Sequence, residues 1–118
     1  MGFQIDTKDF IAYFEQTKKV IAGQKEYVTE LDSTTGDGDH WVNINMGFEK
    51  ITALSQELET MDLAAMFKKV GMTMYSAVGG SSGALYGSGY MAASRYCTGK
   101  DYLDVHSLYE MYEAMLQE

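Results

Sequence analysis

Residues 31–47 read LDSTTGDGDHWVNINMG, and this stretch holds the features around which the rest of the chain is organised. Asp32, Asp37 and Asp39 place three carboxylates within eight positions, and Gly36 and Gly38 alternate with them. The glycines permit sharp backbone turns, so all three side chains can be directed towards one point. A cation bound between the carboxylates relieves their mutual repulsion. Because oxygen ligands favour Mg²⁺ or Ca²⁺, the stretch predicts a metal site.

The spacing of this stretch excludes the calcium loop of an EF-hand, which needs an acidic or amide ligand at its fifth position. Counted from Asp32 or from Asp37, the fifth residue is Gly36 or Trp41. A second interpretation stays open, in which the stretch is an acidic loop and Asp39 caps the helix that follows. Capping explains any one aspartate well but all three poorly, and the residues therefore favour a metal site.

The composition is that of one acidic domain. The chain has 118 residues, a formal net charge of -8 and a sequence pI near 4.6. Binding to a phosphate backbone needs clustered Lys and Arg, so we expect no nucleic-acid partner. No apolar run approaches the roughly 20 residues that cross a bilayer, and the N-terminus lacks a basic region followed by an apolar stretch, so we expect no membrane partner. The single Cys97 suits a reducing cytoplasm, which is the expected location.

The chain contains no proline but nine Met and nine Tyr, which favours long helices over strands and turns. Apolar residues recur near a 3.6-residue period along much of the sequence. This period predicts an all-α fold with helices from Asp6 or Thr7 to Gly23, over residues 24–31, 39–59, 62–78 and 84–96, and from Asp101 or Asp104 onward. Small residues at positions 84, 87, 88, 89, 92 and 93 are expected to let the helix over 84–96 pack closely against its neighbours.

The last expected helix places Val105, Leu108, Tyr112 and Met115 on one side and has no stop signal before Glu118. It ends without Gly, Pro or a basic last turn, and an acidic residue stands at the negative end of the helix dipole. We therefore expect residues 1–118 to be the N-terminal part of a single longer domain. Apolar surface should be exposed where further helices would pack.

Two segments have the composition of an anion site. In the expected helix over residues 39–59, His40, Asn43 and Gly47 follow at i, i+3 and i+7 on the face opposite the apolar stripe, near an N-terminus whose free N–H groups favour anions. Residues 79–83, GGSSG, are expected to form a loop whose N–H and hydroxyl donors can cradle a phosphate. Simpler interpretations stay open: His40 as a helix-start residue bonded to local backbone, and the pentapeptide as a flexible linker.

Two nucleotide-binding motifs are excluded. No segment matches the P-loop pattern G-x-x-x-x-G-K-[ST]. Residues 87–92 fit the loose dinucleotide pattern G-x-G-x-x-[GA], but the strand that should precede it is not predicted, so the match is interpreted as accidental.

Two segments resemble the motifs of a known family. Residues 31–48, LDSTTGDGDHWVNINMGF, and residues 68–87, KKVGMTMYSAVGGSSGALYG, are similar to the paired motifs L-D-x-x-x-G-D-G-D-H-G-x-N-M-x-R-G and V-G-G-A-S-G-P-L-Y-G. These motifs belong to the nucleotide-binding L-subunit domain of dihydroxyacetone kinases. The resemblance implies an all-α barrel of eight antiparallel helices, of which this sequence covers the first five or six. It also implies ADP or ATP held at one rim through two Mg²⁺ ions.

Carried over by position, the resemblance implies that Asp32, Asp37 and Asp39 are metal ligands. It implies nucleotide contacts from six further residues: His40, Trp41, Val42, Asn43, Ser81 and Ser82. In the phosphotransferase-linked version of the family, bound ADP receives a phosphoryl group from a phosphohistidine donor, the M subunit, and passes it to dihydroxyacetone on the K subunit. In the ATP-dependent version, both domains share one chain and the nucleotide exchanges. Because the sequence begins with the L-like helix, we expect a separate L subunit; a homodimer stays open.

The sequence departs from the family motifs at four positions: Trp41 replaces Gly, Ile44 replaces Met, Met46 replaces Arg, and Ala84 replaces Pro. These departures leave open a divergent, non-catalytic binding or regulatory module. The related fatty-acid kinase domain is less similar, because its motif has P-D-G-D-T-G where residues 36–41 read GDGDHW. The family segment that completes the adenine pocket is missing, so residues 1–118 alone are expected to be weak or inactive as a phosphotransferase component.

Overall fold

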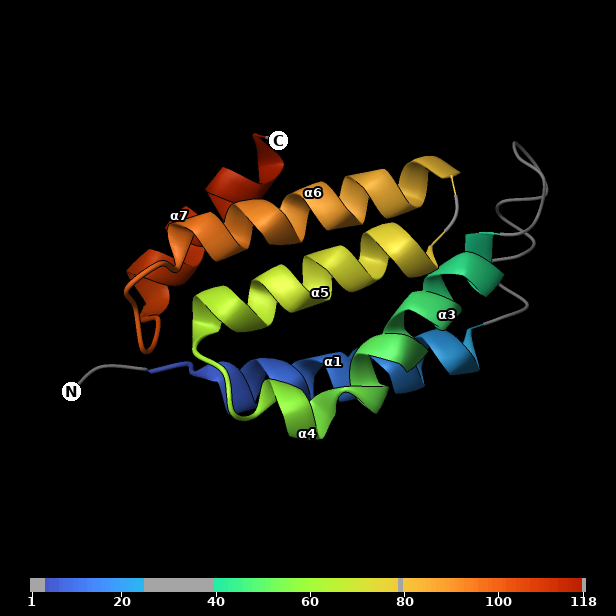
Figure 1. The fold of residues 1–118 in the computed structure, drawn as a ribbon, viewed down its shortest axis with the longest axis horizontal. Coiled ribbons are helices and arrows are strands. Elements are labelled where there is room, and N and C mark those ends of the chain that lie inside the picture. The colour runs from blue at the N-terminus through green and yellow to red at the C-terminus, as the bar shows by residue number, and fades with distance from the viewer. Residues whose placement is uncertain (1–3, 25–39, 79, 118) are drawn as a thin grey trace.

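The computed structural model of the protein is a bundle of antiparallel helices (Figure 1). It describes residues 4–24, 40–78 and 80–117. The helices are α1 Thr7–Gly23, α3 His40–Ala53, α4 Ser55–Leu58, α5 Leu63–Ala77, α6 Gly80–Tyr96 and α7 Val105–Leu116. Within the described ranges there is no strand longer than a single bridge, in which Ile5 and Leu103 exchange two backbone hydrogen bonds of 2.8 Å. The predicted all-α fold class is confirmed.

Aspartate side chains determine where three of the helices begin. Asp6, Asp62 and Asp104 precede α1, α5 and α7, and each accepts a hydrogen bond from the backbone N–H three residues later, at 2.8 to 3.2 Å. In α1 and α7 the third helical residue bonds back to the cap residue, which completes a capping box. The starts predicted at these aspartates are therefore confirmed, as is the end of the first helix at Gly23.

Aromatic side chains from three helices form the centre of the core. The rings of Phe10 in α1 and Phe67 in α5 meet edge to face, with centroids 4.9 Å apart. Tyr90 in α6 stacks on Phe67 at 6.1 Å and meets Phe14 edge-on at 5.8 Å. Such offset and edge-on pairs are the favourable geometries for aromatic rings. Methionine and aliphatic side chains fill the space around them, and those less than 2% exposed include Ile51, Leu58, Leu63, Met66, Val70, Met74, Leu103 and Met111.

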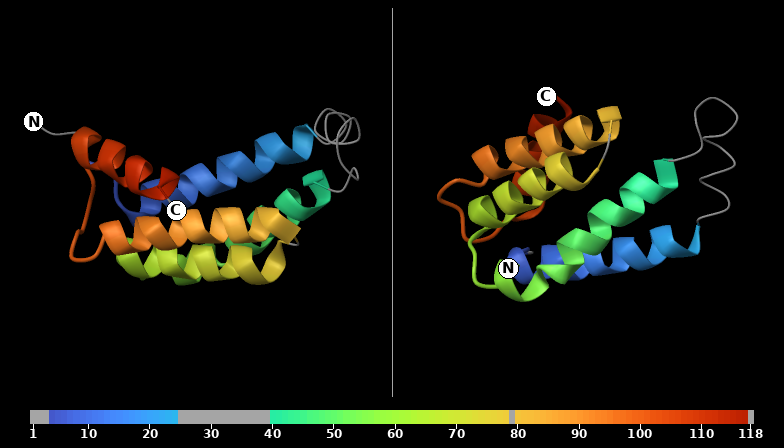
Figure 2. Two further views of the ribbon diagram at one scale, coloured as in Figure 1. Left: turned by 90° about the horizontal axis from the view of Figure 1, so that it is seen from above. Right: turned by 45° about the vertical axis from the view of Figure 1, so that its right-hand side comes forward.

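Helices α5 and α6 lie side by side along most of their length (Figure 2). Their close approach depends on glycine, because a Cβ built on Gly71 would lie 3.1 Å from the carbonyl oxygen of Gly87. A Cβ on Gly87 would lie 2.8 Å from the ring of Tyr75. Ala92 and Ala93 are buried on α6. The prediction that small residues let this helix pack closely is confirmed at positions 87, 92 and 93, whereas Ala84 is exposed.

Two predicted helix boundaries are wrong. Residues 39–59 were expected to form one helix, but α3 ends at Ala53 and α4 begins at Ser55, because Leu54 adopts φ -94° and ψ 6° and its N–H bonds to the carbonyl of Ile51. The helix expected over residues 84–96 begins four residues earlier, at Gly80. The short helix expected over residues 24–31 lies outside the described residues, apart from Gln24, which follows α1.

The apolar side predicted for the last helix is only partly buried in the structure. Val105 is 63% exposed, whereas Met111, which the prediction left out, is 1% exposed. The capping box at Asp104 sets the start of α7, and the helix then turns Met111 towards α6, where its sulfur lies 3.7 Å from the Cys97 sulfur. Leu108 and Met115, on the predicted apolar side, are partly buried against the core.

Candidate functional site

The two segments that carry the family motifs both contribute the start of a helix. His40 begins α3, and Gly80 begins α6. The start of α3, the start of α6 and the end of α1 lie at the same end of the bundle, on the right in Figure 1.

The three predicted metal ligands, Asp32, Asp37 and Asp39, lie outside the described residues. Among residues 4–24, 40–78 and 80–117, no three side chains of His, Cys, Asp or Glu come together as a metal site. A metal site of that kind in this chain would therefore need at least one ligand from outside these ranges. Three carboxylates suit Mg²⁺ as a donor set, because this ion prefers oxygen ligands.

The six predicted nucleotide-contact residues all fall in the first turns of α3 and α6. His40 and Trp41 open α3, and Ser81 and Ser82 follow the first residue of α6; the side chains of these four are outside the described part of the structure. Val42 is 47% exposed. Asn43 is half-buried. The expectation that residues 79–83 form a loop is wrong for residues 80–83, which are helical, so any anion there would meet a helix N-terminus.

The end of α5 packs against both of the helices that carry the family motifs. A Cβ on Gly47 of α3 would lie 2.6 Å from Cγ2 of Val78 and 2.9 Å from Sδ of Met74. A Cβ on Gly83 of α6 would lie 2.1 Å from the carbonyl oxygen of the same Val78. All three distances are shorter than van der Waals contact, so only glycine fits at either position without a shift. The end of α5 therefore packs against the second turn of α3 and the first turn of α6.

We call the contacts of Met74 and Val78 with Gly47 and Gly83 the joint. The joint corrects one expectation about Gly47. It also adds Met74 and Val78 to the residues that shape the candidate site. Gly47 was expected to present bare backbone to a ligand, but it is buried against α5. Met74 and Val78 were predicted only as core residues, although they touch both motif helices. The sequence signal that could have identified the joint is the pair of glycines, one in each motif, because a glycine inside a helix costs stability unless close packing requires it.

The residue that precedes α6 differs from those that precede α1, α5 and α7. Neither α3 nor α6 has an acidic residue in its first turn. The residue before α6 is Gly79, which has no side chain to occupy the helix N–H groups. By contrast, α1, α5 and α7 each begin with an aspartate that accepts such a bond. The helix dipole at the start of α6 favours an anion, and Gly79 adds no side-chain carboxylate there.

Asn45, on the second turn of α3, has an unsatisfied polar atom. Its side-chain nitrogen donates a hydrogen bond to the Glu49 carboxylate, while its side-chain oxygen is buried without a partner among the described residues. Leaving such an atom unpaired costs stability, so an N–H or O–H donor from outside the described ranges would be favourable here. This residue was not predicted as part of the site.

None of the described helices is long and apolar enough to cross a membrane.

These observations define a class of protein: an all-helical domain in which one end of the bundle brings together two helix starts that follow an acidic stretch and a glycine-rich stretch. The chain belongs to the DAK2 domain family, whose characteristic pattern matches residues 34–118. This confirms the relationship inferred from residues 31–48 and 68–87.

The chain is also similar to ADP-binding subunits of dihydroxyacetone kinases from three bacteria. The chain is 34% identical over 93 residues to the ADP-binding subunit DhaL of the PEP-dependent dihydroxyacetone kinase of Escherichia coli, covering 79% of this chain and 44% of that protein. It is 38% identical over 98 residues to the corresponding subunit of kinase 2 of Listeria innocua, covering 81% of this chain and 45% of that protein. The Lactococcus lactis subunit, from a PTS-dependent dihydroxyacetone kinase, is 38% identical over 91 residues, which are 77% of this chain and 46% of that protein. The chain thus spans about half the length of these relatives.

Proposed function

We propose that this chain is the N-terminal part of an ADP-binding L subunit of a dihydroxyacetone kinase. In this role it would accept a phosphoryl group on bound ADP from a phosphohistidine donor, the M subunit, and pass it to dihydroxyacetone on the K subunit. The observation that carries the proposal is that the starts of α3 and α6 lie at one end of the bundle (Figure 1), with Met74 and Val78 packed against both helices. The proposed phosphoryl transfer is inferred from the relatives, which are named as ADP-binding subunits of PEP-dependent or PTS-dependent dihydroxyacetone kinases.

In the proposed site, Asp32, Asp37 and Asp39 would hold Mg²⁺, with two ions expected. The bound metal would supply positive charge against the phosphate oxygens. The first-turn N–H groups of α3 and α6 would donate hydrogen bonds to the nucleotide phosphates, together with Ser81 and Ser82. His40, Trp41, Val42 and Asn43 would contact the nucleotide from α3. The protein's part is to position reacting groups and stabilise charge, which is the main contribution of proteins to phosphoryl transfer.

The test is nucleotide binding by the full-length protein in the presence of Mg²⁺. ADP should raise the melting temperature of the wild type, and Asp37→Asn should abolish this rise while leaving helix content nearly unchanged. Asp101→Asn is the matched control, because Asp101 is an exposed aspartate in the turn between α6 and α7, and it should retain the full rise. Trp41 lies in the first turn of α3, so its emission gives a second readout that should change saturably with ADP. A full ADP-dependent rise in Asp37→Asn would show that the three-carboxylate site is wrong.

The same purified protein can be used to distinguish the phosphotransferase-linked version of the kinase from the ATP-dependent version. In the phosphotransferase-linked version, ADP should stay bound through purification and should be phosphorylated by the phosphohistidine donor. In the ATP-dependent version, added ATP should exchange with the bound nucleotide and support phosphorylation of dihydroxyacetone without that donor.

A non-catalytic binding module is the second candidate, and the surface of α3 favours it. Met46 is 41% exposed and lies one turn after Val42, which is 47% exposed, so this part of α3 presents apolar surface. The family motif has Arg at the position of Met46, and a cation there is lost in this chain. If the full-length wild type binds ADP but transfers no phosphoryl group with its K subunit, and Met46→Arg restores transfer, the module is the better description of the natural protein.

A further inference from the structure

Tyr75, near the end of α5, contacts α6 at two points. A Cβ built on Gly87 of α6 would lie 2.8 Å from each of the ring atoms Cγ, Cδ1 and Cδ2 of Tyr75. Because these three distances are equal, the Cβ position lies over the face of the ring, and the ring is flat against α6 at Gly87. The Tyr75 hydroxyl and the Ser88 Oγ atom are 3.0 Å apart and share a hydrogen bond. The ring and its hydroxyl therefore contact two consecutive residues of α6.

The side of α6 that faces α5 has few side chains that could resist sliding. Gly83 and Gly87 are one turn apart on this side, and each meets α5 without a Cβ. Met91 follows on the same side and packs against Gly71 with a flexible side chain. Packed helices interlock through side chains that project between those of the neighbouring helix. At the two glycines of α6, the ring of Tyr75 and its directional hydrogen bond supply this interlocking.

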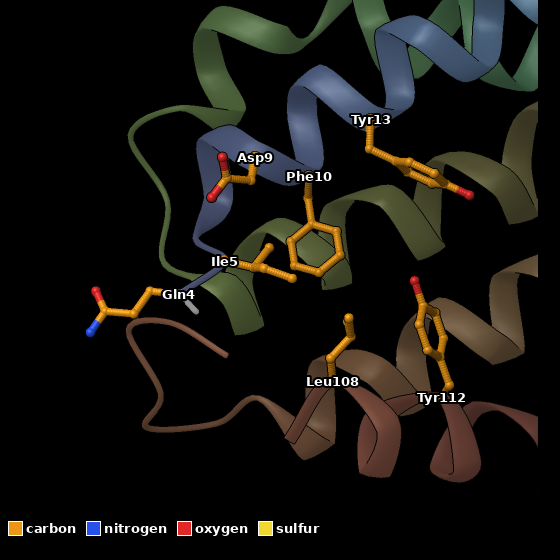
Figure 3. Close-up of a pocket in the computed structure, with 7 residues that line it drawn as sticks. All are labelled: Gln4, Ile5, Asp9, Phe10, Tyr13, Leu108 and Tyr112. Carbon is orange, nitrogen blue, oxygen red and sulfur yellow. The ribbon is translucent and has the colours of Figure 1, made fainter. Parts of the chain in front are cut away.

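The core side of α6 is less closely packed than the side that faces α5. A cavity of about 50 Å³ lies against Tyr90 of α6. This cavity shares Phe10, Tyr13 and Tyr112 with a groove of about 300 Å³ between α1 and α7 (Figure 3). Side chains that border empty space have fewer atoms in contact, so they restrain a helix less. The contacts with α5 therefore restrain the position of α6 more than the contacts around this cavity do.

We propose that Tyr75 is a positioning residue for nucleotide binding, which sets the register of α6 against α5 through its hydrogen bond to Ser88. This inference rests on the proposed function, in which N–H groups in the first turn of α6 donate hydrogen bonds to the nucleotide phosphates. Neither Tyr75 nor Ser88 is among the six predicted nucleotide-contact residues.

A shift of α6 at Ser88 would reach the start of the same helix. Ser88 is eight residues after Gly80, the first residue of α6, which is about 12 Å along the helix. The intervening backbone is helical, so a translation at Ser88 moves the first-turn N–H groups with it. Hydrogen bonds weaken when their distance or angle changes, and misplaced binding groups lose much of their effect. Tyr75 therefore acts on the phosphates without touching them.

The test is isothermal titration of ADP into the full-length protein with Mg²⁺, at a temperature where circular dichroism shows every variant to be folded. Tyr75→Phe keeps the ring on Gly87 and removes the hydroxyl, whereas Ser88→Ala removes the partner of that hydroxyl. Each variant should raise the Kd for ADP about three- to tenfold, as for the loss of one hydrogen bond. The double variant should bind ADP no more weakly than either single variant, because both changes break the same bond. Ser88→Thr retains a hydroxyl and should bind ADP like the wild type.

Tyr96→Phe is the matched control. The Tyr96 hydroxyl donates a hydrogen bond of 2.7 Å to Oε1 of Glu110, so this change also removes a bond between α6 and a neighbouring helix, α7. Tyr96 is the last residue of α6, about 24 Å from the start of the helix. The variant should lower the melting temperature of the nucleotide-free protein and leave the Kd for ADP unchanged. This contrast separates a positioning role from a general contribution to stability.

Three results would overturn the inference while the proposed function stands. The first is equal ADP affinity of the wild type, Tyr75→Phe and Ser88→Ala. The second is an equal loss of affinity in Tyr96→Phe, which would indicate a general effect of weakening α6. The third is a double variant in which the two single losses add, which would show that they do not act through one bond. If the wild type itself binds no ADP, the proposed function is wrong, and the inference that rests on it is wrong as well.

Discussion

Replacing Gly83 by alanine tests the joint between the two motif helices. The new Cβ would lie 2.1 Å from the Val78 carbonyl oxygen, 3.1 Å from the Val78 carbonyl carbon and 3.2 Å from the Met74 carbonyl oxygen. All three are backbone atoms of α5 or of Val78, the residue that follows it, so no side chain can rotate away to make room. The start of α6 must therefore move relative to α5 by about 1 Å before the methyl group fits.

The expected cost follows from two opposing effects. Alanine in place of glycine within a helix is worth about 1 kcal/mol in helix propensity. Overpacking costs about 1 to 3 kcal/mol, and the upper value applies here because backbone must move. The variant should therefore lose about 2 kcal/mol of stability. Gly89→Ala, in the same helix, is the matched control: its Cβ would lie 3.7 Å from Cε of Met115, an ordinary contact, so it should gain up to about 1 kcal/mol.

The assay is urea unfolding of the two variants and the wild type, followed by circular dichroism at one protein concentration. The predicted difference between the variants is about 3 kcal/mol, or about 12 °C in melting temperature for a chain of this size. In the full-length protein, Gly83→Ala should also weaken the ADP-dependent rise in melting temperature, because it displaces the start of α6. Equal stability of Gly83→Ala and Gly89→Ala would refute the joint.

Two further predictions concern stability and pH. Asp6→Ala removes the capping box of α1 and should cost about 1 kcal/mol in urea unfolding; the exposed Lys8→Ala is its control, and an equal effect of both would contradict the role of the cap. Burial raises the pKa of the Cys97 thiol to about 11, so iodoacetamide at pH 8.5 should modify it slowly in the folded chain and rapidly in urea. Because the folded pKa lies above the unfolded value of about 8.5, this thiol's contribution to stability is complete below pH 8.5 and is lost as the pH rises towards 11. Rapid modification of the folded chain would contradict the burial of Cys97.

Much of the helical architecture follows from local sequence. Asp6, Asp62 and Asp104 start helices because a carboxylate can pair with N–H groups of the first turn, which is an interaction between residues three apart. The apolar period identifies the buried side of α5, including Leu63, Met66 and Val70, for the same local reason. The paired motifs likewise place the chain in the DAK2 family, because they are read directly from residue order.

The site is less predictable, because its parts are far apart in sequence. The roles expected for Asp32, Asp37 and Asp39 remain predictions, since those residues lie outside the described ranges. Periodicity could assign Met74 and Val78 to the core, but it could not show that they touch both motif helices. The sequence also could not show that residues 80–83 are helical, because glycine and serine have low intrinsic helix propensity.

What the sequence by itself determined is therefore the set of local interactions: capped helix starts, apolar stripes and the order of the motifs. Tertiary structure alone decided how the helices are rotated and how closely they meet. Gly47 and Gly83 are both buried because packing against α5 leaves no room for a Cβ, and Met111 rather than Val105 is buried because α7 packs against Cys97. These outcomes depend on close packing between residues distant in the chain, which a periodic pattern does not specify.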